Sequence, residues 1–127
     1  MSVNRKGFTL IELILVIVLL GFLAVVAISK YYDLTTSARD AAEKGVAGAV
    51  RSGILTYFAK NKVYPATLDG YANRDCSATI KCFDTVLDQG GVQKDWTKDS
   101  ATAYTGPSGA TYTYTAATGA FIGVPED

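Results

Sequence analysis

The sequence contains no histidine at all, and only two of its 127 residues are cysteine. The missing histidine excludes a catalytic imidazole and every metal site that uses histidine ligands. Two thiols are too few for a structural zinc site, which takes four ligands. We identify no group of residues in the sequence that matches a known catalytic arrangement. We therefore expect no enzyme activity, no metal site and no cofactor.

Net charge is also missing, because twelve basic and twelve acidic side chains cancel. A balanced chain creates no long-range field that would attract nucleic acid or an anionic surface. A basic strip for DNA would have acids scattered through it: the bases are Lys60, Lys62, Arg74 and Lys81, and the acids are Asp69, Asp75 and Asp84. We therefore expect no nucleic-acid partner.

Residues 8–28 form a long apolar run in which only Thr9 and Glu12 are polar. As a helix this run extends about 30 Å, which is the thickness of the hydrocarbon core of a bilayer. Arg5 and Lys6 precede it, so the positive-inside rule predicts a cytoplasmic N-terminus. The run is longer than the apolar core of a secretory signal peptide, and no A-x-A cleavage site follows it. A plain signal anchor and a membrane helix with a second role are the other readings.

Glu12 favours the second role. An ionised carboxylate at the centre of a membrane helix costs about 2.5–3.5 kcal/mol on insertion scales. No lysine or arginine follows within one or two helical turns, so a group on another chain is the obvious partner.

The stretch KGFTLIEL, residues 6–13, resembles the processing signal of type IV prepilins and type II secretion pseudopilins. The resemblance implies that a prepilin peptidase cuts between Gly7 and Phe8, and that Phe8 is then N-methylated. It also implies that Glu12 pairs with the N-terminal amine of a neighbouring subunit, which would fix the register between subunits. One departure is Ser29, which stands where many type IV pilins carry a proline.

Residues 30–60 continue the helical pattern into an amphipathic stretch. Apolar or small residues recur in steps of four, which predicts one buried face; they are Leu34, Ala38, Ala42, Val46, Val50, Ile54 and Phe58. The charged residues are expected on other faces, and they are Arg39, Asp40, Glu43, Lys44 and Arg51. We predict one continuous helix over residues 8–60, and the alternative is two helices with a break near Ser29.

The stretch after the helix is expected to be mostly loop as far as about residue 100. The helix is expected to end at residues 61–71, because Pro65 and Gly70 favour a loop there. Residues 82–91 could hold a short helix or strand.

Residues 111–115 and 120–124 give the clearest strand pattern and predict a hairpin with its turn at Thr118-Gly119. Alternation places the two tyrosines, Tyr112 and Tyr114, on one face and the threonines on the other. One face of the hairpin is expected to cover the helix at Val46, Val50 and Ile54. A hairpin alone is marginal, so a third strand is expected from Val86-Leu87 or from residues 101–105.

Cys76 and Cys82 are read as a disulfide, since a close pair in a small exported domain is typical of one. The alternative is two unrelated free thiols. In many type IV pilins the disulfide encloses a larger C-terminal region. Here the cysteines enclose a short loop before the predicted strands, so we do not infer the family's disulfide-bounded region for this chain.

Calcium is a further hypothesis, because major pseudopilins bind it in a C-terminal loop. Asp95, Asp99 and Ser100 offer oxygen ligands, but Lys94 and Lys98 lie between them. A solvated loop is the favoured interpretation.

These features predict an α+β fold of the type IV pilin kind, in which a long N-terminal helix packs against a small antiparallel sheet. The expected parts are a leader (1–7), a transmembrane and polymerisation helix (8–29), an amphipathic helix (30–60), and a head with an αβ-loop and C-terminal strands (61–127). Before processing, the chain is expected to cross the bacterial inner membrane once; after assembly it is expected in an extracellular pilus.

The predicted function is a structural subunit of a type IV pilus that serves adhesion, motility or surface attachment. The expected partners are further copies in a helical homopolymer, the inner membrane, the prepilin peptidase and the pilus assembly machinery. The alternatives are a pseudopilin of a type II secretion system and a membrane-anchored binding module that does not polymerise.

Overall fold

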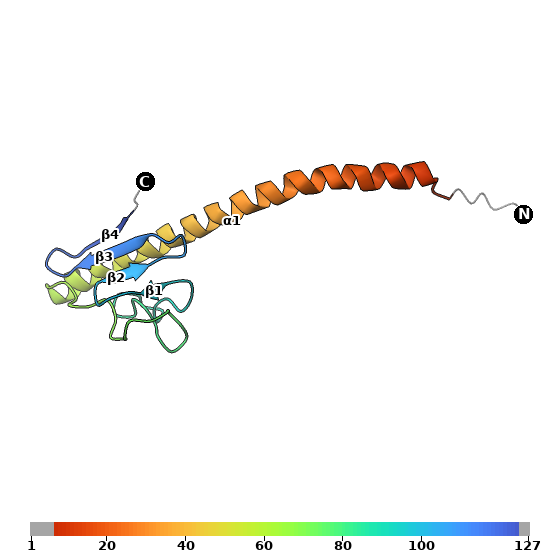
Figure 1. Ribbon diagram of the computed structural model, residues 1–127. Helices are drawn as coiled ribbons and strands as arrows, with labels where there is room; N and C mark the ends of the chain where they lie inside the picture. The colour runs from red at the N-terminus through yellow and green to blue at the C-terminus, as the bar shows by residue number, and fades with distance from the viewer. Residues whose placement is uncertain (1–6, 125–127) are drawn as a thin grey trace, which may run out of the picture. The chain divides into compact units, whose positions relative to one another are not determined.

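The computed structural model describes residues 7–124 and has an α+β fold: one long helix followed by four short strands (Figure 1). The elements are α1 (Leu10–Asn61), β1 (Thr97–Lys98), β2 (Ala103–Thr105), β3 (Thr111–Thr115) and β4 (Ala120–Val124). The chain divides into two compact units, Met1–Ser37 and Ala38–Asp127, and α1 belongs partly to each. Arg5, Lys6 and the rest of the leader before Gly7 lie outside the described residues.

In the first unit, residues 10–37 belong to α1. It continues through Gly21 and Ser29 without a break, so the prediction of a single helix is confirmed. Its side chains from Leu10 to Ile28 are all exposed, although nearly all of them are apolar. By length and composition, α1 could cross a membrane.

In the second unit, α1 buries the stripe Glu43, Ala47, Val50 and Ile54. The predicted stripe was right at Val50 and Ile54, but Leu34, Ala38 and Ala42 are exposed. The reason is geometric: with 3.6 residues per turn, each step of four advances about 40° around the helix. Over several turns a row with strict steps of four therefore leaves the buried face, whereas alternating steps of four and three stay on it.

Glu43 was predicted on a solvent face, and this prediction was wrong, because its side chain is buried. Its carboxylate accepts hydrogen bonds from the Ser108 N–H at 2.7 Å and the Tyr112 hydroxyl at 2.9 Å. Gly106 makes room for it, since a Cβ there would lie 2.6 Å from the Glu43 carboxylate. The acid thus ties the loop between β2 and β3 to the helix.

The four strands form an antiparallel sheet in chain order, β1-β2-β3-β4. The predicted hairpin is confirmed: β3 pairs with β4 from Thr111↔Val124 to Thr115↔Ala120. The tyrosines of β3 face inward and its threonines face outward, as the alternation predicted. Gly119 ends the turn in the left-handed region, where glycine is favoured.

The third strand is β2, which lies within residues 101–105, one of the two segments predicted to supply it. The other candidate, Val86-Leu87, was wrong, because these residues form a turn. Residues 82–91 contain neither a helix nor a strand, only turns and one isolated bridge between Cys82 and Val92. β1 was not predicted.

The core of the second unit is an aromatic cluster against the buried stripe of α1. Phe83 lies at its centre, with ring centroids 4.4 Å from Tyr104, 5.3 Å from Trp96 and 5.6 Å from Phe121. Phe83 has a φ of 64°, which is unfavourable for a bulky residue. Packing of its ring on three others holds this backbone conformation in place.

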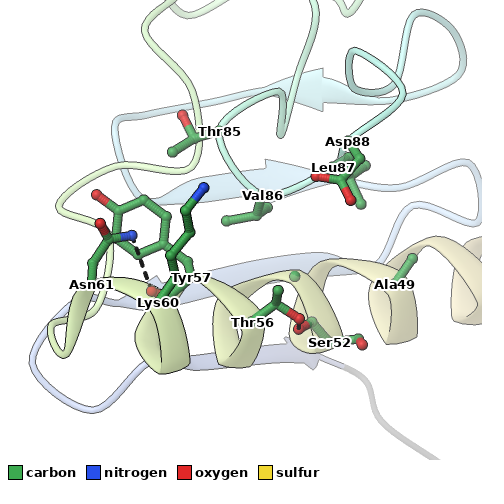
Figure 2. Close-up of a pocket in the computed structure, with 11 residues that line it drawn as sticks. Ala49, Ser52, Thr56, Tyr57, Lys60, Asn61, Thr85, Val86, Leu87 and Asp88 are labelled. Carbon is green, nitrogen blue, oxygen red and sulfur yellow. Dashed lines mark hydrogen bonds between the residues drawn. The ribbon is translucent and has the colours of Figure 1, made fainter.

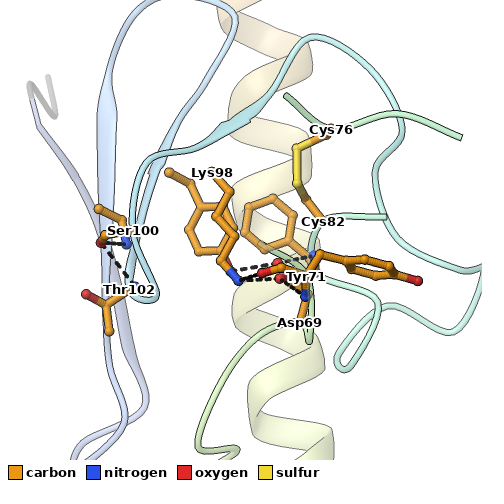
Figure 3. A network of polar contacts seen from close by, with 10 residues as sticks. Asp69, Tyr71, Cys76, Cys82, Lys98, Ser100 and Thr102 are labelled. Carbon is orange, nitrogen blue, oxygen red and sulfur yellow. Dashed lines mark hydrogen bonds and ion pairs between the residues drawn. A yellow bond between two sulfur atoms is a disulfide. The ribbon is translucent and has the colours of Figure 1, made fainter. Parts of the chain in front are cut away.

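Asp69 is a buried acid that joins the loop to the sheet (Figure 3). It accepts hydrogen bonds from Lys98 of β1, from the Tyr104 hydroxyl at 2.7 Å, and from the Phe83 N–H at 3.2 Å. Lys98 Nζ also donates to the carbonyl of Tyr71 at 2.8 Å. Both charges are buried, so Asp69 is not part of an exposed surface of mixed charge. Lys98 lies in β1, so the prediction of a solvated loop around it was wrong at this residue.

The predicted disulfide is present: Cys76 and Cys82 are joined, with Cα atoms 5.6 Å apart. Both cysteines are buried beside the aromatic cluster. Backbone hydrogen bonds link Cys76 to Trp96 and Cys82 to Val92, so the disulfide fastens two loop segments that carry little regular structure.

We predict that Lys98→Met lowers the free energy of unfolding by about 3–5 kcal/mol, because it leaves the Asp69 carboxylate buried without its cation. Denaturant titration of the full chain in detergent micelles, followed by the fluorescence of Trp96, measures this. Lys94→Met is the matched control, since Lys94 is exposed. Equal stability of the two variants would contradict the role given to the ion pair.

We also predict that acid destabilises the second unit through Asp69. Burial would raise the pKa of Asp69, but donation from Lys98, Tyr104 and two backbone N–H groups outweighs burial and holds the pKa below its usual 3.8. Because the pKa is lower in the folded state, the stabilisation is complete above the unfolded value of about 3.9 and is lost as the pH falls through the folded value.

Denaturation midpoints measured between pH 6 and pH 2 test this prediction. They should fall more steeply below pH 4 for the parent chain than for Asp69→Asn, while Asp88→Asn, which changes an exposed acid, should follow the parent. A parallel fall in all three chains would refute it.

Candidate processing and assembly site

Gly7, Phe8 and Thr9 precede the first turn of α1 and are not helical. The Phe8 side chain is 92% exposed, and Gly7 has open space where a Cβ would lie. The Gly7–Phe8 peptide bond therefore lies in an exposed, irregular segment rather than inside the helix.

Thr9 and Glu12 form a reciprocal pair of hydrogen bonds at the start of α1. The Thr9 N–H donates to Glu12 Oε2 at 3.3 Å, and the Glu12 N–H donates to Thr9 Oγ1 at 3.2 Å. The Thr9 carbonyl accepts the helical bond of Leu13. This is a capping box, with Thr9 as the N-cap residue.

The capping box matters because the helix that follows is apolar. The first N–H groups of a helix have no intrahelical acceptor, and in a water-poor environment each unsatisfied one is costly. Thr9 and Glu12 satisfy two backbone donors with their own side chains. The carboxylate is also held at the N-terminal end of the helix, where the macrodipole favours negative charge.

The structure thus brings Phe8, Thr9 and Glu12 together at one end of α1. Phe8 and Glu12 were predicted as site residues from the sequence, whereas Thr9 was noted only as a polar residue in an apolar run. The pattern Thr-x-x-Glu ahead of apolar residues was a signal that could have identified it. Cys76 and Cys82 form a structural cross-link within the second unit.

The second unit also has an open groove of about 490 Å³ between α1 and the turn around Val86 (Figure 2). The helix approaches this turn closely, because a Cβ at Gly53 would lie 2.1 Å from the Val86 carbonyl oxygen. Hydroxyl groups of Ser52, Thr56 and Tyr57 line it, together with Lys60 and the exposed Asp88. Among these described lining residues there is no buried base that would activate a hydroxyl.

Two of the three residues considered for calcium, Asp99 and Ser100, accept hydrogen bonds from protein groups. Asp99 accepts a hydrogen bond from the Thr105 hydroxyl at 2.6 Å, and Ser100 accepts one from the Ala103 N–H at 3.0 Å. Within residues 7–124, no three Cys, Asp or Glu side chains are grouped so that they could hold a metal ion.

The family model described as the prokaryotic N-terminal methylation motif matches residues 3–28. This range includes the Gly7–Phe8 bond, the capping box and the apolar part of α1. It also contains residues 6–13, the stretch that resembles the prepilin processing signal.

Several curated relatives match the chain. A narrow pilus major component, PilA5 of Thermus thermophilus, is 39% identical over 76 residues, covering 60% of this chain and 66% of that protein. The fimbrial protein EcpC of Eikenella corrodens is 36% identical over 49% of this chain and 40% of its own length. The type IV major pilin PilE of Neisseria gonorrhoeae is 37% identical over 51% and 39%. No solved structure matches the chain.

We predict that Thr9→Val destabilises the first turn of α1 by about 1 kcal/mol, since valine cannot accept the Glu12 N–H. Amide hydrogen exchange of the full chain in micelles should show about fivefold less protection at the Glu12 amide, the equivalent of that energy. Thr9→Ser keeps the hydroxyl and should retain the protection. Equal exchange in Thr9→Val and Thr9→Ser would show that the hydroxyl does not cap the helix.

Proposed function

The chain belongs to the type IV pilin family, and on this premise we propose that it is the structural subunit of a pilus, assembled through the first half of α1. The observation that carries the proposal is the exposed apolar surface from Leu10 to Ile28. An apolar surface of this size is stable only in lipid or against other protein. Membrane insertion and polymerisation provide these two environments in turn.

Processing is the first step that we propose. A prepilin peptidase would remove the leader, residues 1–7, by cutting the exposed Gly7–Phe8 bond, and the new amine of Phe8 would then be methylated. The match of the methylation motif across this bond supports the assignment. Residues 8–29 would span the inner membrane before assembly, with the N-terminus in the cytoplasm.

Assembly would then exchange the partners of Glu12. In a single chain its carboxylate meets the Thr9 N–H; in the filament it would meet the cationic amine of Phe8 from an adjacent copy. A buried carboxylate and a buried amine are each costly alone, and pairing removes both penalties. Because the pair forms at only one axial offset between helices, it would set the register of the polymer.

The second unit would form the head that each subunit presents on the fibre. Internal contacts support its core: the disulfide, the Asp69–Lys98 pair and the hydrogen bond from the Ser108 N–H to Glu43. We propose adhesion, motility or surface attachment as the role of the fibre, with a pilus assembly machinery as a further partner. We propose no catalytic activity for the chain.

A pseudopilin of a type II secretion system is the second candidate function, because the same processing signal serves both systems. Electron microscopy of sheared surface material separates them, since long fibres containing this chain exclude a short periplasmic piston as its sole role. A membrane-anchored binding module that never polymerises is the third reading, and cross-linking in membranes tests it.

We predict that Glu12→Leu reduces the yield of sheared filaments at least about tenfold, because the amine of Phe8 would be buried without its partner, a cost of several kcal/mol. The precursor should still accumulate in the membrane, since leucine inserts readily. Asp40→Asn, which changes an exposed acid of the same helix, is the control and should assemble normally. Normal filament yield from Glu12→Leu would remove the proposed pairing.

A further inference from the structure

After the apolar part of α1 and Ser29 come four residues with polar groups, Lys30, Tyr31, Tyr32 and Asp33. The two tyrosines are 73% and 74% exposed, and no ring contact to either is recorded among the described residues. The backbone of this turn is engaged, because the Thr35 and Thr36 hydroxyls donate hydrogen bonds to the carbonyls of Tyr31 and Tyr32.

Exposed tyrosines at this position have a preferred environment. Tyrosine combines an apolar ring with a hydroxyl that needs water, so it is enriched where hydrocarbon meets the headgroups of a bilayer. Lysine and aspartate beside it require water and are costly inside hydrocarbon. Residues 13–28 are all apolar or glycine, and tyrosines and charged residues begin by Tyr32, which marks a sharp boundary on the helix.

The same helix fixes the depth of Glu12 relative to that boundary. Glu12 and Tyr31 are 19 residues apart on a continuous helix, a rise of about 28 Å at 1.5 Å per residue. The hydrocarbon core of a bilayer is about 30 Å thick. When Tyr31 lies at one interface, Glu12 therefore lies at the other and not in the middle of the membrane.

We propose that Tyr31 and Tyr32, flanked by Lys30 and Asp33, bind the headgroup region on the outer side of the membrane and hold α1 at a depth that keeps Glu12 hydrated at the cytoplasmic edge. The proposal rests on the membrane orientation given under the proposed function. It adds a lipid-binding surface to the chain and a role for that surface in the stage before assembly.

This depth determines the stage at which the Glu12 carboxylate loses its water. In the membrane stage, Glu12 meets headgroup water and the Thr9 N–H, so most of its hydration is retained. Desolvation is postponed until the subunit leaves the bilayer for the filament, where the amine of a neighbour is available. The tyrosine anchor thus separates the two stages in which the acid needs different partners.

Cysteine labelling of the full-length precursor in sealed membranes tests the proposal. Cys76 and Cys82 are joined and buried, so introduced thiols report alone. With a charged maleimide that does not enter hydrocarbon, Thr36→Cys should react from the outer side at least about tenfold faster than Ile28→Cys. In inverted vesicles, Glu12→Cys should exceed Val16→Cys by a similar factor of about ten.

Replacing the anchor should move the helix. In a Tyr31→Ala/Tyr32→Ala background, Glu12 can follow its preference for water into the cytoplasmic headgroups, so labelling of Val16→Cys from that side should rise about threefold or more. Tyr31→Trp/Tyr32→Trp keeps interfacial aromatics and should retain the parent pattern. Leu34→Ala removes exposed apolar bulk nearby and should have no effect.

Three results would overturn the proposal: equal labelling at Ile28→Cys and Thr36→Cys, protection of Glu12→Cys equal to that of Val16→Cys, or no change when the tyrosines are replaced. If the parent chain still forms filaments, these results leave the proposed function intact. A chain that alkaline carbonate strips from membranes would overturn both.

Discussion

The apolar surface of the first half of α1 is the constraint on which the rest of this chain depends. From Leu10 to Ile28 every side chain is exposed. The free energy of this surface in water is unfavourable, so the molecule must always be in lipid or against another protein. A subunit that moves between these two environments needs polar groups placed so that neither environment leaves them unsatisfied.

The second unit meets the opposite requirement, because it must stay folded whatever the first unit contacts. Its strands are short, and its loops from residue 62 to residue 96 carry little regular structure. The contacts that hold these loops are specific and buried: Asp69 with Lys98 and Tyr104, and Glu43 with Ser108 and Tyr112. Buried polar groups of this kind add uniqueness to the fold, since few other arrangements satisfy them all.

Local sequence patterns predicted much of this fold. The long apolar run, the alternation of tyrosine and threonine, and the close cysteine pair each require only neighbouring residues, and each leads to the observed helix, hairpin and disulfide. The burial of Glu43 and of Lys98 could not be predicted from local patterns. Their partners lie 65 and 29 residues away along the chain, and a charged residue in a polar stretch has the same local pattern whether it is buried or solvated.

Within the candidate site, Phe8 was predicted from a resemblance, and Glu12 from the resemblance and from the cost of a carboxylate in an apolar run. The role of Thr9 was recognised from its hydrogen bonds, although the pattern Thr-x-x-Glu also indicates it. The capping box makes Glu12 a structural residue before it has any role in assembly. Because its carboxylate accepts the Thr9 N–H, it lies at the N-terminal end of α1, where the proposed pairing would place the terminus of another copy. Because one bond to a neutral N–H is weaker than an ion pair, the amine that we propose as its partner could displace it. Under that proposal, the capping box would stabilise the single subunit without competing strongly against the polymer.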